Sequence, residues 1–144
     1  MDFMTTMQTE KLTESSPPAF TPASPDAEQV LQAAARALAD RKGQQLSVLD
    51  LTGITTVARY FLIATGTSTT HIKALADSVE DSLGKRGLHP FRRNGYASAR
   101  WILLDYSDVV VHVFHEQERD FYGLERLWQD ARPVSPAGLL SADG

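Results

Sequence analysis

The chain has 144 residues, a formal net charge of −4 and no cysteine. The length fits a single domain, the negative charge argues against binding nucleic acid through global electrostatics, and the lack of cysteine excludes disulfides, thiolate zinc sites and cysteine nucleophiles. No apolar run approaches the ~20 residues that a membrane helix needs, and no secretory signal is recognisable at the N-terminus. We therefore expect a cytoplasmic protein.

The sequence divides into a leader, a folded domain and a tail. Residues 1–24 are rich in Thr, Ser, Pro, Gln and Glu and have no apolar period, which is typical of a disordered leader. We place the folded domain at residues 25–131. A flexible C-terminal tail is expected at residues 132–144, because Pro133 and Pro136 end the ordered pattern.

The first half of the domain predicts a helix, two strands and a second helix. Ser24-Pro25 has the pattern of an N-cap followed by proline at the first helical position. The link between the two strands is short for a crossover helix, so we expect antiparallel or mixed pairing. The predicted elements are a helix from Ser24 to about Lys42, strands at Leu46–Leu51 and Tyr60–Thr65, and a helix from the turn Gly66-Thr67-Ser68 to Gly87.

The second half predicts three strands and a last helix, with Asn94-Gly95 as a strong turn signal. The complete order of elements predicts an α/β fold: a single domain with a mixed, mostly five-stranded sheet and helices mainly on one side. The predicted elements are strands at Pro90–Arg93, residues 101–105 and residues 109–114, and a helix from Asp120 to Trp128 or Gln129.

Residues 101–128 carry an unusual density of aromatic and acidic side chains. Aromatic anchors among carboxylates are typical of a protein surface that binds a basic partner, and they do not have the layout of a common active site. The set comprises Trp101, Tyr106, Phe121, Tyr122 and Trp128 with Asp105, Asp108, Glu116, Glu118, Asp120 and Glu125, opposed only by Arg119 and Arg126.

The pairing of the last two predicted strands decides which side chains share a face. If residues 106–108 form a three-residue loop, Asp105 lies opposite Val109, and Trp101 and Leu103 share a face with valines. With few helices to cover the sheet, this Trp-Leu-Val face is expected to be partly open, and such a patch usually marks a binding site. The alternative is that the C-terminal helix covers Trp101.

Two other patterns favour different ligands. His112 and His115 can share a metal only if the chain bends after Phe114, because residues i and i+3 of a strand point to opposite faces. We interpret His112 as a core residue. The one basic cluster could contact RNA phosphates, although a solvated, guarded sheet edge is the more common role for such residues. It comprises Lys85, Arg86, Arg92, Arg93 and Arg100.

The turn Gly66-Thr67-Ser68 resembles a helix N-terminus that binds phosphate, and it is also similar to the Gly-Ser turn of nucleotidyltransferases. It lacks the GxGxxG and GxxxxGK patterns, and no carboxylate pair for two metals lies near it. We interpret it as a capping turn. A nucleotidyltransferase-like nucleotide-binding protein that uses Gly66 to Ser68 is the alternative function.

Three segments of the domain have a characteristic order and spacing. They are VLDLTGITTVARYFLIATGTST, HIKALADSVEDSLGKRG and RWILLDYSDVVVHVFHEQERDFYGLERLW, and the match covers roughly residues 28–131. Together they resemble the ribosomal silencing factor family (RsfS, also called Iojap-related). Arg59 and Asn94 stand where this family usually has acidic residues.

The resemblance implies a fold similar to that of nucleotidyltransferases, with no catalytic activity and no cofactor. It implies a translational repressor that binds the large ribosomal subunit through large-subunit ribosomal protein fourteen and sterically blocks the small subunit. A homodimer off the ribosome stays open, and RNA contact is at most peripheral. The implied partner-binding residues are Trp101, Tyr106 and Tyr122 for apolar contacts and Asp105, Asp108, Glu118 and Arg119 for polar contacts, and Leu103 joins them through the predicted open face.

Overall fold

A six-stranded sheet forms the centre of the computed structural model, which describes residues 26–141. The strand order is β3-β4-β5-β2-β1-β6. β2 and β5 are parallel and all other neighbours are antiparallel, which confirms the mixed sheet and the predicted pairing of the first two strands. The strands are β1 Gln44–Asp50, β2 Tyr60–Gly66, β3 Arg92–Asn94, β4 Trp101–Asp105, β5 Val109–His115 and β6 Arg132–Val134.

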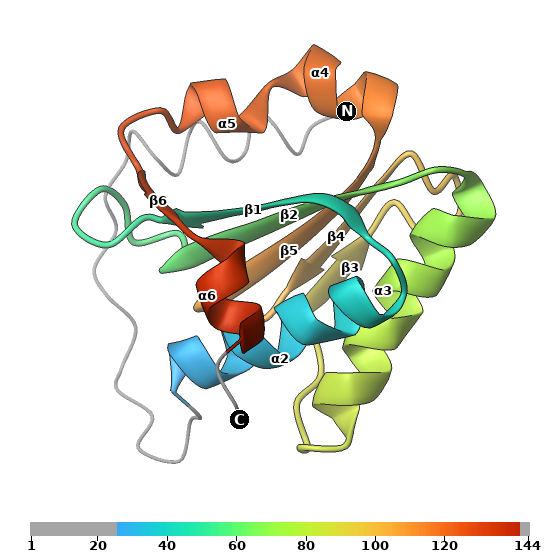
Figure 1. Cartoon of the computed structure of the whole chain (residues 1–144), viewed down its shortest axis with the longest axis horizontal. Helices are drawn as coiled ribbons and strands as arrows, with labels where there is room; N and C mark the ends of the chain where they lie inside the picture. Colours follow the sequence, from blue (N-terminus) through green and yellow to red (C-terminus); the bar gives the residue numbers. More distant parts are fainter. Residues whose placement is uncertain (1–25, 142–144) are drawn as a thin grey trace.

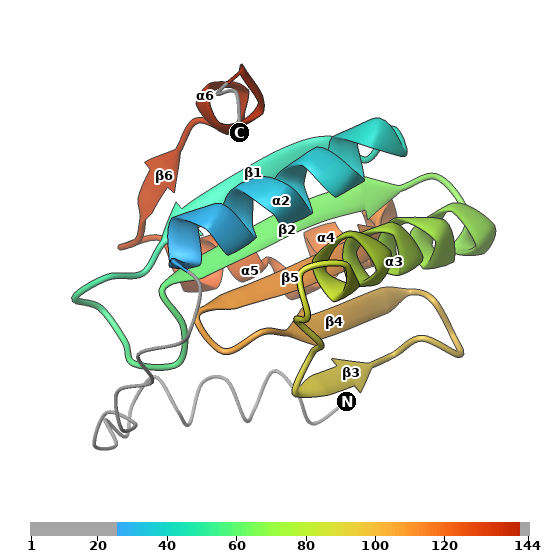
Figure 2. The same ribbon diagram turned by 90° about the horizontal axis from the view of Figure 1, so that it is seen from below.

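Helices lie on both faces of the sheet, as Figures 1 and 2 show. The two long helices share one face, and two short helices lie over the other face (Figure 1). The helices are thus concentrated on one side, as predicted. Their bounds are α2 Ala27–Asp40 and α3 Thr69–Gly84 on the first face, α4 Glu116–Tyr122 and α5 Leu124–Leu127 on the second, and α6 Pro136–Ser141 beside α2.

Two hydrophobic cores follow from this arrangement. The first lies between the sheet and helices α2 and α3, and the second lies on the sheet face beneath α4 and α5. β2 is buried along its whole length, as expected for a strand that is covered on both faces. Burial on both faces also means that successive residues of β4 enter different cores.

The first helix begins later than the sequence predicts. Its N-cap is Asp26, whose carboxylate accepts a hydrogen bond from the Glu28 N–H at 3.3 Å, whereas the predicted cap Ser24 lies outside the described residues. Arg59 donates to the Glu28 carboxylate at 3.3 Å, and the Tyr60 hydroxyl donates to the same oxygen at 3.2 Å. The basic residue at position 59 therefore ties the start of α2 to the start of β2.

The pairing of β4 with β5 differs by one residue from the prediction. The connection has two residues, Ser107 and Asp108, because the Tyr106 N–H donates to the Val109 carbonyl at 2.9 Å and closes the turn. Asp105 consequently lies opposite Val110. The predicted faces were wrong: Trp101, Leu103 and Asp105 share their face with Phe114, His112 and Val110, and the other valines of β5 line the first core.

The predicted last helix is two helices, and the first of them starts earlier. His115 caps α4, because its Nδ1 accepts from the Gln117 N–H at 3.3 Å. Gly123 then takes a left-handed conformation, with φ of 54°, and ends α4. A left-handed residue cannot continue an α-helix, so α5 starts in a new direction.

Residues 132–141, which the sequence analysis placed in a flexible tail, form β6 and α6. β6 pairs with β1, and Arg132 donates to the Asp50 carboxylate at 2.8 Å. Burial raises the pKa of Asp50, but hydrogen bonds from Thr52 and Arg132 outweigh it and lower the pKa to about 2. The Asp50 carboxylate therefore stays charged and keeps its ion pair with Arg132 of β6.

Candidate functional site

Trp101 lies in the second core and not on an open face. Its side chain is 3% exposed and Leu103 is 2% exposed, so the expectation of an open Trp-Leu-Val patch is wrong. The physical reason is that Tyr122 of α4 and Leu124 of α5 pack over this face and cover it. The alternative, in which the C-terminal helical segment covers Trp101, agrees with the structure.

An aromatic cluster surrounds the Trp101 indole. The indole stacks on Phe114 with ring centroids 4.7 Å apart, and Tyr122 lies 4.8 Å away on α4. The indole Nε1–H donates to His112 Nδ1 at 3.2 Å. Aromatic pairs at such distances stabilise a fold beyond the burial of their surface. Trp101 therefore links β4 and β5 to α4 through Phe114 and Tyr122.

The predicted site residues fall into separate groups. Glu118 and Tyr122 lie on α4 near Trp101, whereas Asp105 lies at the other end of β4, about 13 Å along the strand at a rise of ~3.3 Å per residue. Asp108 is exposed on the adjoining turn. Tyr106 points into the first core, where burial raises its pKa. The structure therefore brings Trp101, Leu103, Glu118 and Tyr122 together, and it does not place Tyr106 with them.

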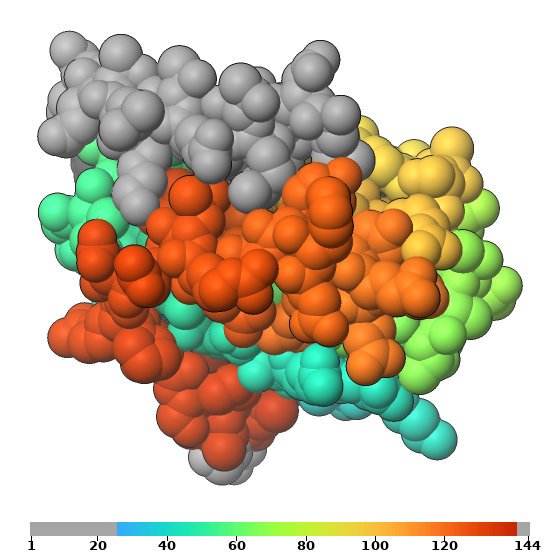
Figure 3. Space-filling model, turned by 90° about the horizontal axis from the view of Figure 1, so that it is seen from above, coloured from blue at the N-terminus to red at the C-terminus, as the bar shows by residue number. Residues whose placement is uncertain are grey.

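The outward side of α4 is acidic and aromatic. We define the α4 outer face as Glu116, Gln117, Asp120 and Phe121, all of which are exposed. Phe121 is 79% exposed, although large apolar side chains are usually buried. In the space-filling view, α4 and α5 form the orange band across this side of the molecule (Figure 3). The sequence contains one indication of this face: Gln117 and Phe121 are four residues apart, so they lie on the same side of a helix.

The basic cluster is largely neutralised by ion pairs. Arg92 contacts Asp105 at 3.1 Å, and Arg93 contacts Glu80 at 3.0 Å. Arg100 contacts Glu118 at 2.9 Å. Nucleic-acid affinity depends on arginines that neutralise phosphates, and these guanidinium groups already bind carboxylates. The RNA-binding interpretation therefore loses its main support.

The Gly66–Ser68 turn is a capping turn in the structure. The Ser68 hydroxyl accepts from the His71 N–H at 3.0 Å, and the Thr67 N–H donates to His71 Nδ1 at 3.0 Å. A phosphate-binding turn needs such N–H groups for its ligand, and here side chains of the same helix occupy them. This geometry disfavours the alternative of a nucleotide-binding protein.

Gly66 is needed for packing, and its replacement by alanine is expected to destabilise the protein. A Cβ at this position would lie 2.6 Å from Ile72 Cγ1 and 3.1 Å from the Ile72 nitrogen. We expect Gly66→Ala to lower the free energy of unfolding by about 1–3 kcal/mol, the usual effect of overpacking, as measured by urea denaturation. The control is Gly84→Ala in α3, where the nearest atom is 3.8 Å away. Helix propensity predicts a neutral or stabilising change there, and an equal loss in both variants would contradict the packing argument.

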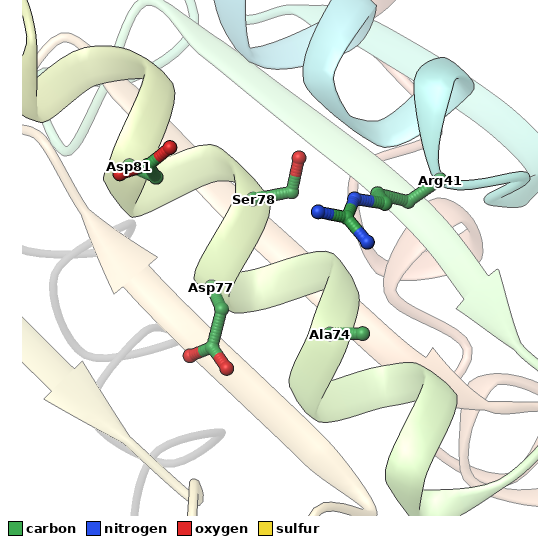
Figure 4. A pocket seen from close by; sticks show the side chains of 5 residues that line it. All are labelled: Arg41, Ala74, Asp77, Ser78 and Asp81. Atoms are coloured by element: carbon green, nitrogen blue, oxygen red, sulfur yellow. The ribbon is translucent and has the colours of Figure 1, made fainter.

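Residues 26–141 were also compared with the requirements of a metal site and of a membrane helix. Within residues 26–141, no group of three or more His, Asp or Glu side chains is placed to hold a metal ion, and no helix there could cross a membrane. A hollow of about 400 Å³ lies beside α3. Figure 4 shows the Arg41 side chain extending toward Ser78 in this hollow. The predicted site residues do not line it.

Comparisons with known proteins identify the relatives of the chain. The family model described as "Ribosomal silencing factor during starvation" matches residues 24–143. The protein named ribosomal silencing factor RsfS from Bacillus subtilis is 43% identical over 102 residues, which cover 71% of this chain and 86% of that protein. The RsfS of Halalkalibacterium halodurans is 41% identical over 114 residues, which cover 79% and 97%. A crystal structure of a Chromobacterium violaceum protein, 35% identical, superimposes with a TM-score of 0.71 and covers 81% of this chain and all of that one.

Proposed function

The chain belongs to the ribosomal silencing factor family, and on this basis we propose that it represses translation by binding the large ribosomal subunit. The contact is with large-subunit ribosomal protein fourteen. The bound domain fills space that the small subunit needs and so prevents the two subunits from joining. Family membership is the observation that carries this proposal.

The α4 outer face is the part of the molecule best suited to dock on a basic ribosomal protein. Phe121 offers an exposed aromatic anchor, and Glu116 and Asp120 flank it with negative charge. Aromatic side chains often dominate the binding energy of an interface, and complementary charge increases the rate of association and fixes the orientation. Two arginines border this face, since Arg100 donates to the Gln117 side chain and Arg126 donates to the Asp120 carbonyl, both at 3.2 Å. The charged side chains of the face itself are Glu116 and Asp120.

The predicted site residues take different roles in this proposal. Trp101 and Leu103 support the surface from beneath, and Tyr122 is half-buried between them and solvent. Asp105 and Asp108 lie at the far end of the strands. The proposed contact therefore rests on the α4 outer face and not on these two carboxylates.

Co-sedimentation with separated ribosomal subunits tests the binding step. We expect the full-length protein to sediment with the large subunit and not with the small subunit. Phe121→Ala should weaken this binding by about 10- to 100-fold, since loss of an aromatic anchor costs ~1.5–3 kcal/mol. Titration of labelled protein against the large subunit measures the change. Binding of the wild type to neither subunit would reject the proposal.

Phe91 provides a matched control for Phe121. It is 77% exposed and lies beside β3, away from α4. Because both rings are exposed, neither alanine variant should change stability by more than ~0.5 kcal/mol. Phe91→Ala should bind like the wild type.

Two further assays complete the test: a pull-down with isolated ribosomal protein fourteen, and a light-scattering assay in which the protein should reduce subunit joining.

A further inference from the structure

α4 is a short helix that burial alone does not hold in place. It has seven residues, and none of them is fully buried. Helices of this length are unstable by themselves, so contacts to the rest of the domain must fix the direction of α4. Apart from the packing of Tyr122 on Trp101, α4 is held by polar contacts, and one side chain makes four of these hydrogen bonds. That side chain is Arg119.

Arg119 connects α4 to two strands and to α5. Its Nη1 donates to the Gln45 carbonyl at 2.7 Å and to the Thr65 hydroxyl at 2.8 Å. Its Nε and Nη2 donate to the two carboxylate oxygens of Glu125 at 3.2 and 3.0 Å. The Arg119 side chain is only 10% exposed. The guanidinium group therefore acts inside the fold, whereas the family resemblance implied a polar contact with the partner.

The acceptors of Arg119 are themselves fixed by the fold. Gln45 lies in an irregularity of β1, with φ of 51°, where the register with β2 shifts between Gln44 and Ser47. Thr65 is 4% exposed near the end of β2. The hydrogen bond from Arg119 lowers the pKa of Glu125, against the opposing effect of burial, so this carboxylate stays charged. Because the planar guanidinium has a fixed fork of donors, it can satisfy all three acceptors at once, which a lysine ammonium cannot do in the same geometry.

A second ion pair on α4 is more exposed to solvent. Arg100 contacts Glu118 at 2.9 Å, and its side chain is 42% exposed. Exposed ion pairs hold little energy and are screened by salt. Arg119 is the better shielded of the two, and it reaches the sheet directly.

We infer that Arg119 is a positioning residue that holds α4 so that the α4 outer face is presented to the partner. This inference rests on the proposed function, since it concerns the same docking surface. Arg119 and Phe121 are neighbours along α4 but point differently, Arg119 inward and Phe121 outward. Loss of the inward contacts leaves the chemistry of the outer face unchanged and releases its orientation. Binding then weakens because the partner must order α4.

The test is Arg119→Lys in the full-length protein, which keeps the charge and removes the fork. We expect binding to the large subunit to weaken by about tenfold. Hydrogen exchange of amides 116–122 should accelerate by at least about tenfold, while amides of β2 and β5 keep their protection. Thr65→Val removes one acceptor with little change of shape and should give the same pattern to a smaller extent. It keeps the test informative if Arg119→Lys folds poorly.

Arg92→Lys is the control, because Arg92 pairs with Asp105 at the other end of β4. It should leave both binding and α4 exchange unchanged. The inference is overturned if wild type binds and Arg119→Lys binds within twofold of it. It is also overturned if sheet and α4 amides lose protection together, since Arg119 would then serve global stability only. Failure of the wild type to bind would instead reject the proposed function, whereas the exchange pattern would still report on α4.

Discussion

Replacing Trp101 with alanine is expected to lower the free energy of unfolding by about 3–5 kcal/mol, the usual cost of removing a buried tryptophan. The indole is 3% exposed and stacks on Phe114. It also donates to His112 Nδ1 at 3.2 Å, so its removal takes away a partner from a buried ring nitrogen. Urea denaturation followed by far-ultraviolet circular dichroism measures the loss, and a value below ~1 kcal/mol would contradict the burial of Trp101.

The expected loss of stability limits what Trp101→Ala can show in a binding assay. This substitution removes the ring on which Tyr122 packs, and that contact supports α4. Weaker ribosome binding by this variant would therefore not identify Trp101 as a direct contact. Trp101→Phe keeps an aromatic ring on Phe114 and loses the Nε1–H donor. We expect it to cost ~1–2 kcal/mol and to bind like the wild type at temperatures where it is fully folded.

The sequence was sufficient for the elements that depend on local signals. The apolar stretch Tyr60–Thr65 predicted a strand, and Gly66-Thr67-Ser68 predicted the capping turn of the second helix. The core position of His112 was also predicted, and its side chain is 0% exposed. In each case the signal lies within a few residues and needs no knowledge of a partner strand.

The candidate site depended on features that are not local. A two-residue turn at Ser107 and Asp108 differs from a three-residue loop by one residue, and this difference exchanges the faces of β5 relative to β4. Ser107 has a φ of 75°, which its residue type does not signal. The chemical character of the surface, acidic and aromatic, could be predicted. Which aromatic ring is exposed could not, because the exposure of Trp101 and Phe121 depends on how α4 and α5 pack on the sheet.

Acidification should destabilise the protein through His112. Burial lowers the pKa of this imidazole to about 3, whereas an unfolded chain has a histidine pKa of about 6.5. Between these values the unfolded state binds a proton that the folded state does not, so stability falls as the pH decreases. The full contribution is present above pH ~6.5. Each further unit below that value costs up to ~1.4 kcal/mol, and we expect a loss of about 2–3 kcal/mol between pH 7.5 and pH 4.5.

Urea denaturation at a series of pH values, for the wild type and His112→Gln, isolates this effect. A glutamine amide oxygen can accept the Trp101 Nε1–H, and the side chain does not titrate, so the variant should lose the pH dependence assigned to His112. His115→Gln, at the half-buried cap of α4, controls for the exchange of a histidine for a glutamine as such. An equal slope in the wild type and His112→Gln would show that groups other than His112 cause the loss.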